Sequence, residues 1–129
     1  MLPAPTLDET TIKPLVEAFY AKVRADELLA PVFNAAIADW DDHHARLVDF
    51  WSSIMLASGR YKGSPLALHL LHADAMTPER FARWLELWRQ CSSATLERAA
   101  AASVQAKATR IADSFQLALH YRHPSPAAA

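Results

Sequence analysis

The sequence predicts an all-α fold, and three observations support this class. Only two glycines occur in 129 residues, which is too few for a chain built from tight hairpins. Ala, Leu, Glu, Arg and Lys dominate the rest of the chain, and these residues favour helix. Apolar residues recur at intervals of three and four, the period of a helix with one buried face. We therefore expect a domain of roughly six helices.

Two prolines mark the boundaries of the first expected elements. An apolar stripe from Ile12 to Val23 predicts the first long helix. Because Pro14 lies near its start, we expect the residues before Pro14 to form a separate turn or short helix. The next segment, residues 27–37, contains Pro31 and is expected to form a tight helical corner.

The third expected helix, about residues 39–58, has the most continuous apolar face. Asp39 is its expected N-cap, and Gly59 follows its end as the expected C-cap. Residues along one face of this helix follow the helical period. They are Trp40, His43, Leu47, Phe50, Trp51 and Ile54.

Three further helices complete the expected domain. A short apolar helix is expected over residues 66–71. The run Thr77-Pro78-x-Arg80 is a helix start, with a capping residue followed by proline at the first helical position. An apolar stripe over residues 96–119 predicts the last helix.

Size, charge and cysteine content limit the classes of function. The chain has 13 Lys and Arg against 14 Asp and Glu, so it lacks the basic excess that drives nucleic-acid binding. Its apolar runs are shorter than the ~20 residues that span a bilayer, and we expect neither a signal peptide nor a membrane partner. The lone Cys91 excludes an internal disulfide and is interpreted as a packed small side chain. We expect one cytoplasmic domain over residues 1–129, with tails at about 1–6 and 121–129.

Three polar residues interrupt the apolar stripes and indicate a site. Tyr20 could simply bury its ring and bond its hydroxyl to a backbone carbonyl. His43, beside His44, could mark the entry turn of its helix. His69 is harder to explain as core, because its leucine neighbours offer no partner for a buried imidazole. A metal ion is one natural partner for it.

Two kinds of metal site compete as explanations. His43 and His44 with His69 and His72 could hold a single zinc or iron ion, but no HExxH, ExxH or CxxC spacing supports such a site. A haem needs only one histidine on one side of the iron and an apolar, aromatic pocket elsewhere. The surplus of large aromatic residues suits a haem, although the same residues form an ordinary core in most helical proteins.

Five stretches, in this order and spacing, carry a specific resemblance. They are FYAKVRAD (19–26), APVFNAAI (30–37), DWDDHHARLVDFW (39–51), GRYKGSPLALH (59–69) and FARWLELW (81–88). From about Ile12 to Leu119 the chain resembles the group III truncated haemoglobins. The absence of Gly-Gly pairs also fits that branch.

The resemblance implies a two-over-two helical sandwich around haem b. His69 matches the proximal histidine that binds the iron. The positions that match distal, ligand-contacting residues are Tyr20, Trp84 and His43. Further matches are Phe33 on the porphyrin, Arg46 and Tyr61 at the propionates, and Leu47, Phe50 and Trp51 in the distal cavity.

Neighbouring histidines leave two alternatives open. The stretch from His69 to Trp84 is about one residue longer than the family pattern, so His72 is an alternative iron ligand. His44 is an alternative to His43 as the ring that faces the haem. If His43 itself binds iron, the resting haem would be six-coordinate, as in electron-transfer or sensor proteins.

The implied function is binding of O2, nitric oxide, carbon monoxide or peroxide at the haem iron. Tyr and Trp donors would each stabilise bound O2 by about 1.5–3 kcal/mol, which slows its release. We therefore favour nitric oxide oxidation, peroxide handling or sensing over bulk oxygen transport, and leave enzymatic activity open. Catalysis would need an external reductase, since we recognise no flavin- or nicotinamide-binding segment. The alternative is a haem-free helical bundle with a histidine-based zinc or iron site, or an interaction role.

Overall fold

The computed structural model describes residues 6–63 and 73–122, and these residues are predominantly helical. The all-α prediction is therefore confirmed. The expected helix at residues 66–71 lies outside the described residues. The helices are α1 (Glu9–Ala25), α2 (Ala30–Ala36), α3 (Trp40–Leu56), the 3-10 helix η1 (Ala73–Ala75), α5 (Pro78–Thr95) and α6 (Arg98–Arg122).

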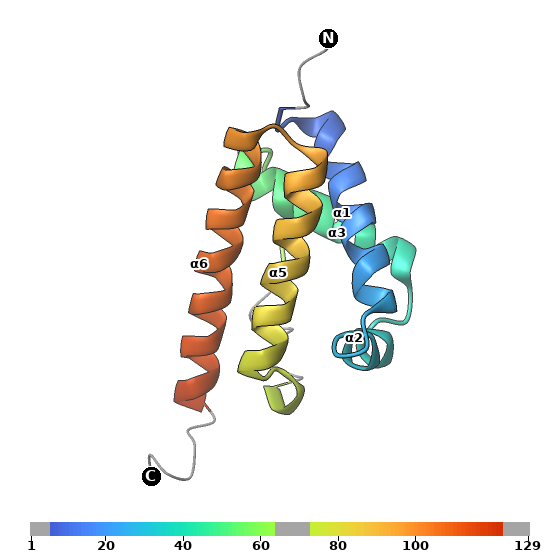
Figure 1. Cartoon of the computed structure of the whole chain (residues 1–129), viewed down its shortest axis with the longest axis vertical. Coiled ribbons are helices and arrows are strands. Elements are labelled where there is room, and N and C mark those ends of the chain that lie inside the picture. The colour runs from blue at the N-terminus through green and yellow to red at the C-terminus, as the bar shows by residue number, and fades with distance from the viewer. Residues whose placement is uncertain (1–5, 64–72, 123–129) are drawn as a thin grey trace.

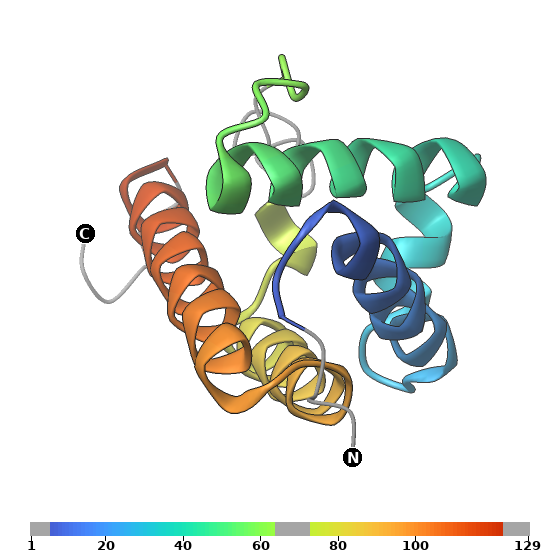
Figure 2. The same cartoon turned by 90° about the horizontal axis from the view of Figure 1, so that it is seen from above.

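The long helices form two packed pairs. Helices α5 and α6 run antiparallel, side by side (Figure 1), and α1 packs against both α3 and α5. Seen from above, α3 crosses the molecule next to α1, whereas α5 is viewed nearly along its axis and α6 obliquely (Figure 2). The short α2 packs against α1. This is the two-over-two arrangement that the resemblance implies.

Helix α1 begins earlier than expected, so the prediction of a separate turn before Pro14 is wrong. Asp8 caps the helix: its carboxylate accepts the backbone N–H groups of Thr10 at 2.8 Å and Thr11 at 3.1 Å. In return, the Thr11 hydroxyl accepts the Asp8 N–H at 2.9 Å. This capping box satisfies the free donors of the first turn, and Pro14 then leaves only one carbonyl without its usual partner.

Helix α3 begins as expected but ends early. Asp39 is its N-cap and accepts the Asp42 N–H at 3.1 Å. The C-cap is Ala57, with a left-handed φ of 58°, and the prediction that Gly59 caps the helix is therefore wrong. The Ala57 N–H bonds the carbonyls of the preceding turn, and this local pairing ends the helix two residues before Gly59.

The remaining helix ends follow local chemistry. Pro31 lies in the first turn of α2 and Pro78 in the first turn of α5, where a missing N–H is tolerated. Thr77 caps α5 and accepts the Arg80 N–H at 3.3 Å. Leu96 belongs to the end of α5 as its C-cap rather than to the last helix. Helix α6 ends at Arg122, beyond the start of the expected tail.

Trp88 lies at the centre of the core. It is 1% exposed, and its indole N–H donates to the Val104 carbonyl at 3.1 Å, joining α5 to α6. Phe19 of α1 packs edge-on against it at 5.0 Å between ring centroids. Cys91 is buried in the same core, as expected for a packed small side chain. Among the described helices, none is both long and apolar enough to cross a membrane.

Candidate functional site

A largely apolar cavity of about 300 Å³ lies among the helices, at the lower end of the range for small-molecule sites. Its polar lining side chains are Tyr20, His43, Arg46, Tyr61, Arg80 and Trp84. The rest of the lining comprises Leu29, Val32, Phe33, Ala36, Ile37, Leu47, Phe50, Trp51, Ala75, Met76, Phe81, Ile111, Ala112 and Phe115.

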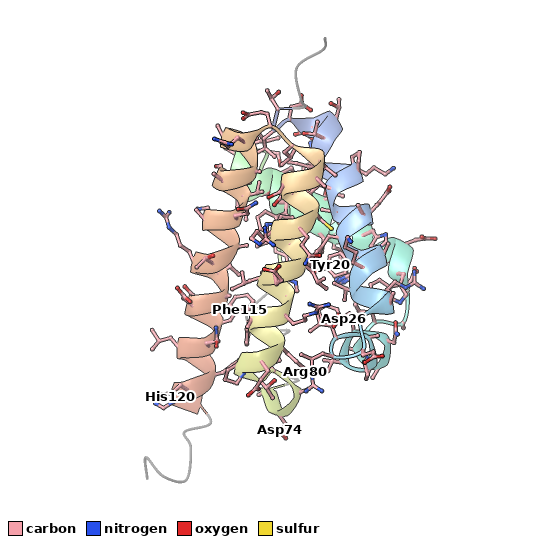
Figure 3. All side chains as sticks on the ribbon, in the orientation of Figure 1. Tyr20, Asp26, Asp74, Arg80, Phe115 and His120 are labelled. Carbon is pink, nitrogen blue, oxygen red and sulfur yellow. The ribbon has the colours of Figure 1, made fainter. Side chains whose placement is uncertain are left out.

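Tyr20 and Trp84 form a hydrogen-bonded pair between α1 and α5. The Tyr20 side chain is 3% exposed and points into the interior from α1 (Figure 3). Because an indole can only donate, the Trp84 N–H donates and the Tyr20 oxygen accepts. Burial raises the pKa of the Tyr20 hydroxyl far above its ordinary value, although the bond from Trp84 opposes this. Tyr20 therefore keeps its proton and can donate it to a further acceptor.

A stack of tryptophan rings holds Trp84 in place. Its ring is parallel to that of Trp88, with 6.2 Å between centroids and 2° between planes. Trp88 in turn stacks on Trp51 of α3 at 4.4 Å. Since Trp88 and Trp51 are both almost fully buried, the Trp84 ring rests on a rigid support.

His43 and His44 occupy different positions although they are neighbours in sequence. His43 lines the cavity and meets the Tyr20 ring edge-on, with centroids 5.1 Å apart. His44 is not among the described lining residues; its ring lies 5.8 Å from Tyr20 and 5.8 Å from Trp40. On the outer side, the Arg24 guanidinium lies 4.5 Å from the centroid of the Trp40 ring. His43 is thus the ring of this pair that lines the cavity.

Two predicted propionate partners also line the cavity. Arg46 is exposed, and its Nε lies 2.9 Å from a carboxylate oxygen of Asp42, one helical turn earlier. Tyr61, in the segment after α3, packs edge-on against Phe50 at 5.4 Å. Its backbone N–H donates to the Ser53 hydroxyl at 2.9 Å, which fixes this segment against α3.

The segment around Tyr61 is tied down at two further points. Arg60 forms ion pairs with Glu9 at the start of α1 and with Asp49 of α3. A Cβ at Gly63 would lie only 2.7 Å from the Tyr61 hydroxyl. Glycine at this position therefore leaves room for the Tyr61 ring beside the backbone.

The structure brings together every predicted distal and haem-contacting residue: Tyr20, Phe33, His43, Arg46, Leu47, Phe50, Trp51, Tyr61 and Trp84 all line the cavity. The predicted iron ligand His69 and its alternative His72 lie outside the described residues. Sequence reasoning missed the other lining residues, and Arg80 is the charged one among them. Arg80 appears in the sequence only as part of a helix start, a signal that carries no information about a cavity.

A histidine-based zinc or iron site finds no support in the described part of the chain. No group of three or more His, Cys, Asp or Glu side chains is placed there to hold a metal ion. Two members of the set considered for such a site, His69 and His72, fall outside that part.

The fold and cavity together define a globin-type helical sandwich, and comparisons with known proteins agree. Residues 7–120 match the bacterial-like globin family. The chain is 34% identical over 119 residues to the group 3 truncated hemoglobin ctb of Campylobacter jejuni, covering 89% of this chain and 93% of that protein. The crystal structure of group III truncated hemoglobin from Campylobacter jejuni matches with a TM-score of 0.83 at 31% identity, covering 96% of this chain and all of that one. The chain belongs to the bacterial-like globin family and is a group III truncated haemoglobin.

Membership of this family implies a haem and the binding of diatomic ligands, and the cavity fits such a group. Its walls are apolar and aromatic, which suits the flat, apolar face of a porphyrin. Its described lining includes two arginines and no acidic side chain, which suits a group with carboxylates at its edge. The Tyr20–Trp84 pair adds hydrogen-bonding groups to the otherwise apolar wall.

Proposed function

We propose that this chain holds haem b in the cavity, where His69 would bind the iron and the distal residues would face O2 or another diatomic ligand. Family membership supports the haem. The single observation that carries the distal role is the buried Tyr20–Trp84 hydrogen bond at the wall of an apolar cavity. When bound, the haem supplies an iron that binds O2, nitric oxide and carbon monoxide and that reacts with peroxide.

Two side chains of the distal wall act as hydrogen-bond donors, and the apolar side chains around them exclude water. Tyr20 keeps its proton because burial raises its pKa, so its O–H is a donor at any physiological pH. Trp84 donates to the Tyr20 oxygen, which fixes the direction of the Tyr20 O–H and strengthens it as a donor. The surrounding apolar side chains exclude water, which strengthens each hydrogen bond made to a ligand.

Strong donors favour retention of O2 over its release. We propose that the chain serves O2-dependent oxidation of nitric oxide, peroxide handling or ligand sensing rather than bulk oxygen transport. For catalysis it would take electrons from a separate reductase. Mixing the oxygenated protein with nitric oxide tests the first of these activities: one nitrate per O2 is expected, and nitrite as the main product would argue against it.

An absorption spectrum tests the cofactor directly. The protein should show an intense Soret band as isolated, which should shift after dithionite and shift again with carbon monoxide. A colourless protein that also fails to take up added haemin would refute the haem proposal. Loss of stability with a chelator would then favour the histidine-based zinc site.

Two histidine variants test the proximal ligand. His69→Ala should lose haem or bind it much more weakly, because the iron loses its protein ligand. His72→Ala is the matched control, three residues away, and should retain haem with an unchanged spectrum. The reverse result would make His72 the iron ligand.

A further inference from the structure

Arg80 lies at the edge of the cavity with its guanidinium half-buried. It comes from the first turn of α5, at the end of that helix nearest η1 (Figure 3). Its Nη1 donates to the Ala75 carbonyl at 2.9 Å, and its Nε donates to the Leu28 carbonyl at 3.2 Å. These two bonds hold the group between η1 and the turn that precedes α2.

This guanidinium has no carboxylate partner among the described residues. Other arginines nearby are paired: Arg83 with Asp26 at 2.7 Å, and Arg46 with Asp42 at 2.9 Å. A guanidinium has five N–H donors, and only two of those of Arg80 have acceptors among residues 6–63 and 73–122. A half-buried cation with spare donors is most stable when an anion completes its partners.

The cavity restricts which anion can do so. Its described lining includes no acidic side chain, so the anion must come from the bound molecule. A porphyrin with propionate side chains brings carboxylates at one edge, which a guanidinium binds with charge-assisted hydrogen bonds. We propose that Arg80 binds a carboxylate of the haem, an assignment that rests on the proposed haem site. To bind the other carboxylate, Arg46 would have to leave Asp42 or bind both groups, whereas Arg80 has no acidic partner to leave in the described part of the chain.

Removing the porphyrin charge distinguishes this role from a structural one. The apoprotein is loaded either with haem or with haem dimethyl ester, which lacks the carboxylate charges. The rate of loss to an excess of a haem scavenger is then measured for wild type, Arg80→Gln and Arg80→Lys. Arg83→Gln is the matched control, since Arg83 lies one helical turn away and is paired with Asp26.

Arg80→Gln should accelerate loss of haem roughly tenfold, a value at the low end for a charge-assisted hydrogen bond because the group is half exposed. It should leave loss of the dimethyl ester unchanged within about twofold. Arg80→Lys should restore part of the difference, because it keeps the charge. Arg83→Gln should affect neither rate.

Three results would overturn the inference. Equal acceleration for haem and its ester would show that Arg80 acts only by joining Ala75 to Leu28. Unchanged rates for both would show that no carboxylate reaches it. An Arg80→Lys protein as fast as Arg80→Gln with haem, yet normal with the ester, would show that charge is not what Arg80 contributes. A wild-type protein that takes up neither porphyrin would instead refute the haem proposal itself.

Discussion

Replacing Tyr20 with phenylalanine removes the hydroxyl through which α1 meets α5 inside the cavity. In the structure this oxygen accepts the Trp84 indole N–H, and its own proton remains available to a ligand. The phenylalanine ring would keep the edge-on contact with His43 and the packing against Phe19, because both involve the ring alone. The variant therefore changes hydrogen bonding with little change in shape. It also leaves the Trp84 N–H without its acceptor and therefore available to a ligand, with the ring still held by its stack.

The expected changes in the rate of O2 dissociation follow from the proposal that Tyr20 donates to the ligand and Trp84 donates to Tyr20. Loss of a hydrogen bond to a partly charged ligand is worth about 1.5–3 kcal/mol, or roughly 10- to 150-fold in the rate of O2 dissociation. Because the freed Trp84 N–H can donate to the ligand instead, it restores part of the lost stabilisation. We therefore expect Tyr20→Phe to accelerate O2 dissociation only about tenfold. Trp84→Phe leaves the Tyr20 O–H in place and should accelerate dissociation about threefold. The double variant, with no donor left from this pair, should reach about 100-fold.

Stopped-flow displacement of O2 by carbon monoxide measures these rates. The expected rate increases of the two single variants multiply to about 30-fold. The expected increase of about 100-fold for the double variant exceeds this product, which corresponds to a coupling of about 0.7 kcal/mol. If the effect of the double variant equals the product of the two single effects within about 0.3–0.5 kcal/mol, the two residues act as independent donors. The proposal that Trp84 acts through Tyr20 would then be wrong. Tyr61→Phe is the control, since it removes a hydroxyl from the lining of the same cavity and leaves the Tyr20–Trp84 pair unchanged. It should change O2 dissociation by no more than about twofold.

Three predictions concern stability and reactivity. Ala57→Gly should raise the free energy of unfolding by about 1 kcal/mol, because Ala57 has a left-handed φ of 58°; an unchanged melting temperature would contradict this. Arg83→Gln should lower the free energy of unfolding by about 1 kcal/mol near neutral pH, where Asp26 is charged and paired. Burial raises the pKa of the Asp26 carboxyl, but Arg83 together with the backbone N–H groups of Leu29 and Leu28 outweighs burial and holds this pKa below its ordinary value of 3.8. The difference in the free energy of unfolding should therefore persist above that pH and fade below it in acid titrations of unfolding, and a constant difference would refute the pairing. Because Cys91 is 2% exposed and burial raises the pKa of its thiol, iodoacetamide should label it about 100-fold more slowly in native than in unfolded protein, and equal rates would show an accessible thiol.

Sequence reasoning located those helix ends that depend on local chemistry. Asp39 and Thr77 cap their helices as predicted, because a side-chain oxygen and the N–H three residues later suffice to form the cap. The two ends that it missed depend on a balance of several groups. Pro14 alone predicts a break, but the capping box at Asp8 stabilises the turn before it. A helix can end at any residue that reaches the left-handed region, and the chain uses Ala57 rather than the more permissive Gly59.

Some residues of the candidate site could be predicted from the sequence and others could not. The resemblance identified residues that the structure brings to one cavity, because spacing in a shared fold determines which positions face it. Sequence reasoning did not identify Arg80, because the role proposed for it depends on which described residues lie near its guanidinium, and the surroundings of a side chain are a tertiary property.

The direction of the Tyr20–Trp84 hydrogen bond could not be predicted from sequence either. Both side chains carry a donor, and on sequence alone each could donate directly to a ligand. In the fold, the tryptophan stack places the Trp84 N–H against the Tyr20 oxygen, and an indole cannot accept in return. In the function that we propose, the two donors would therefore act in series, with Tyr20 bonded to the ligand and Trp84 bonded to Tyr20. A family pattern names both residues, but only their contact in the folded chain shows that one of them donates to the other.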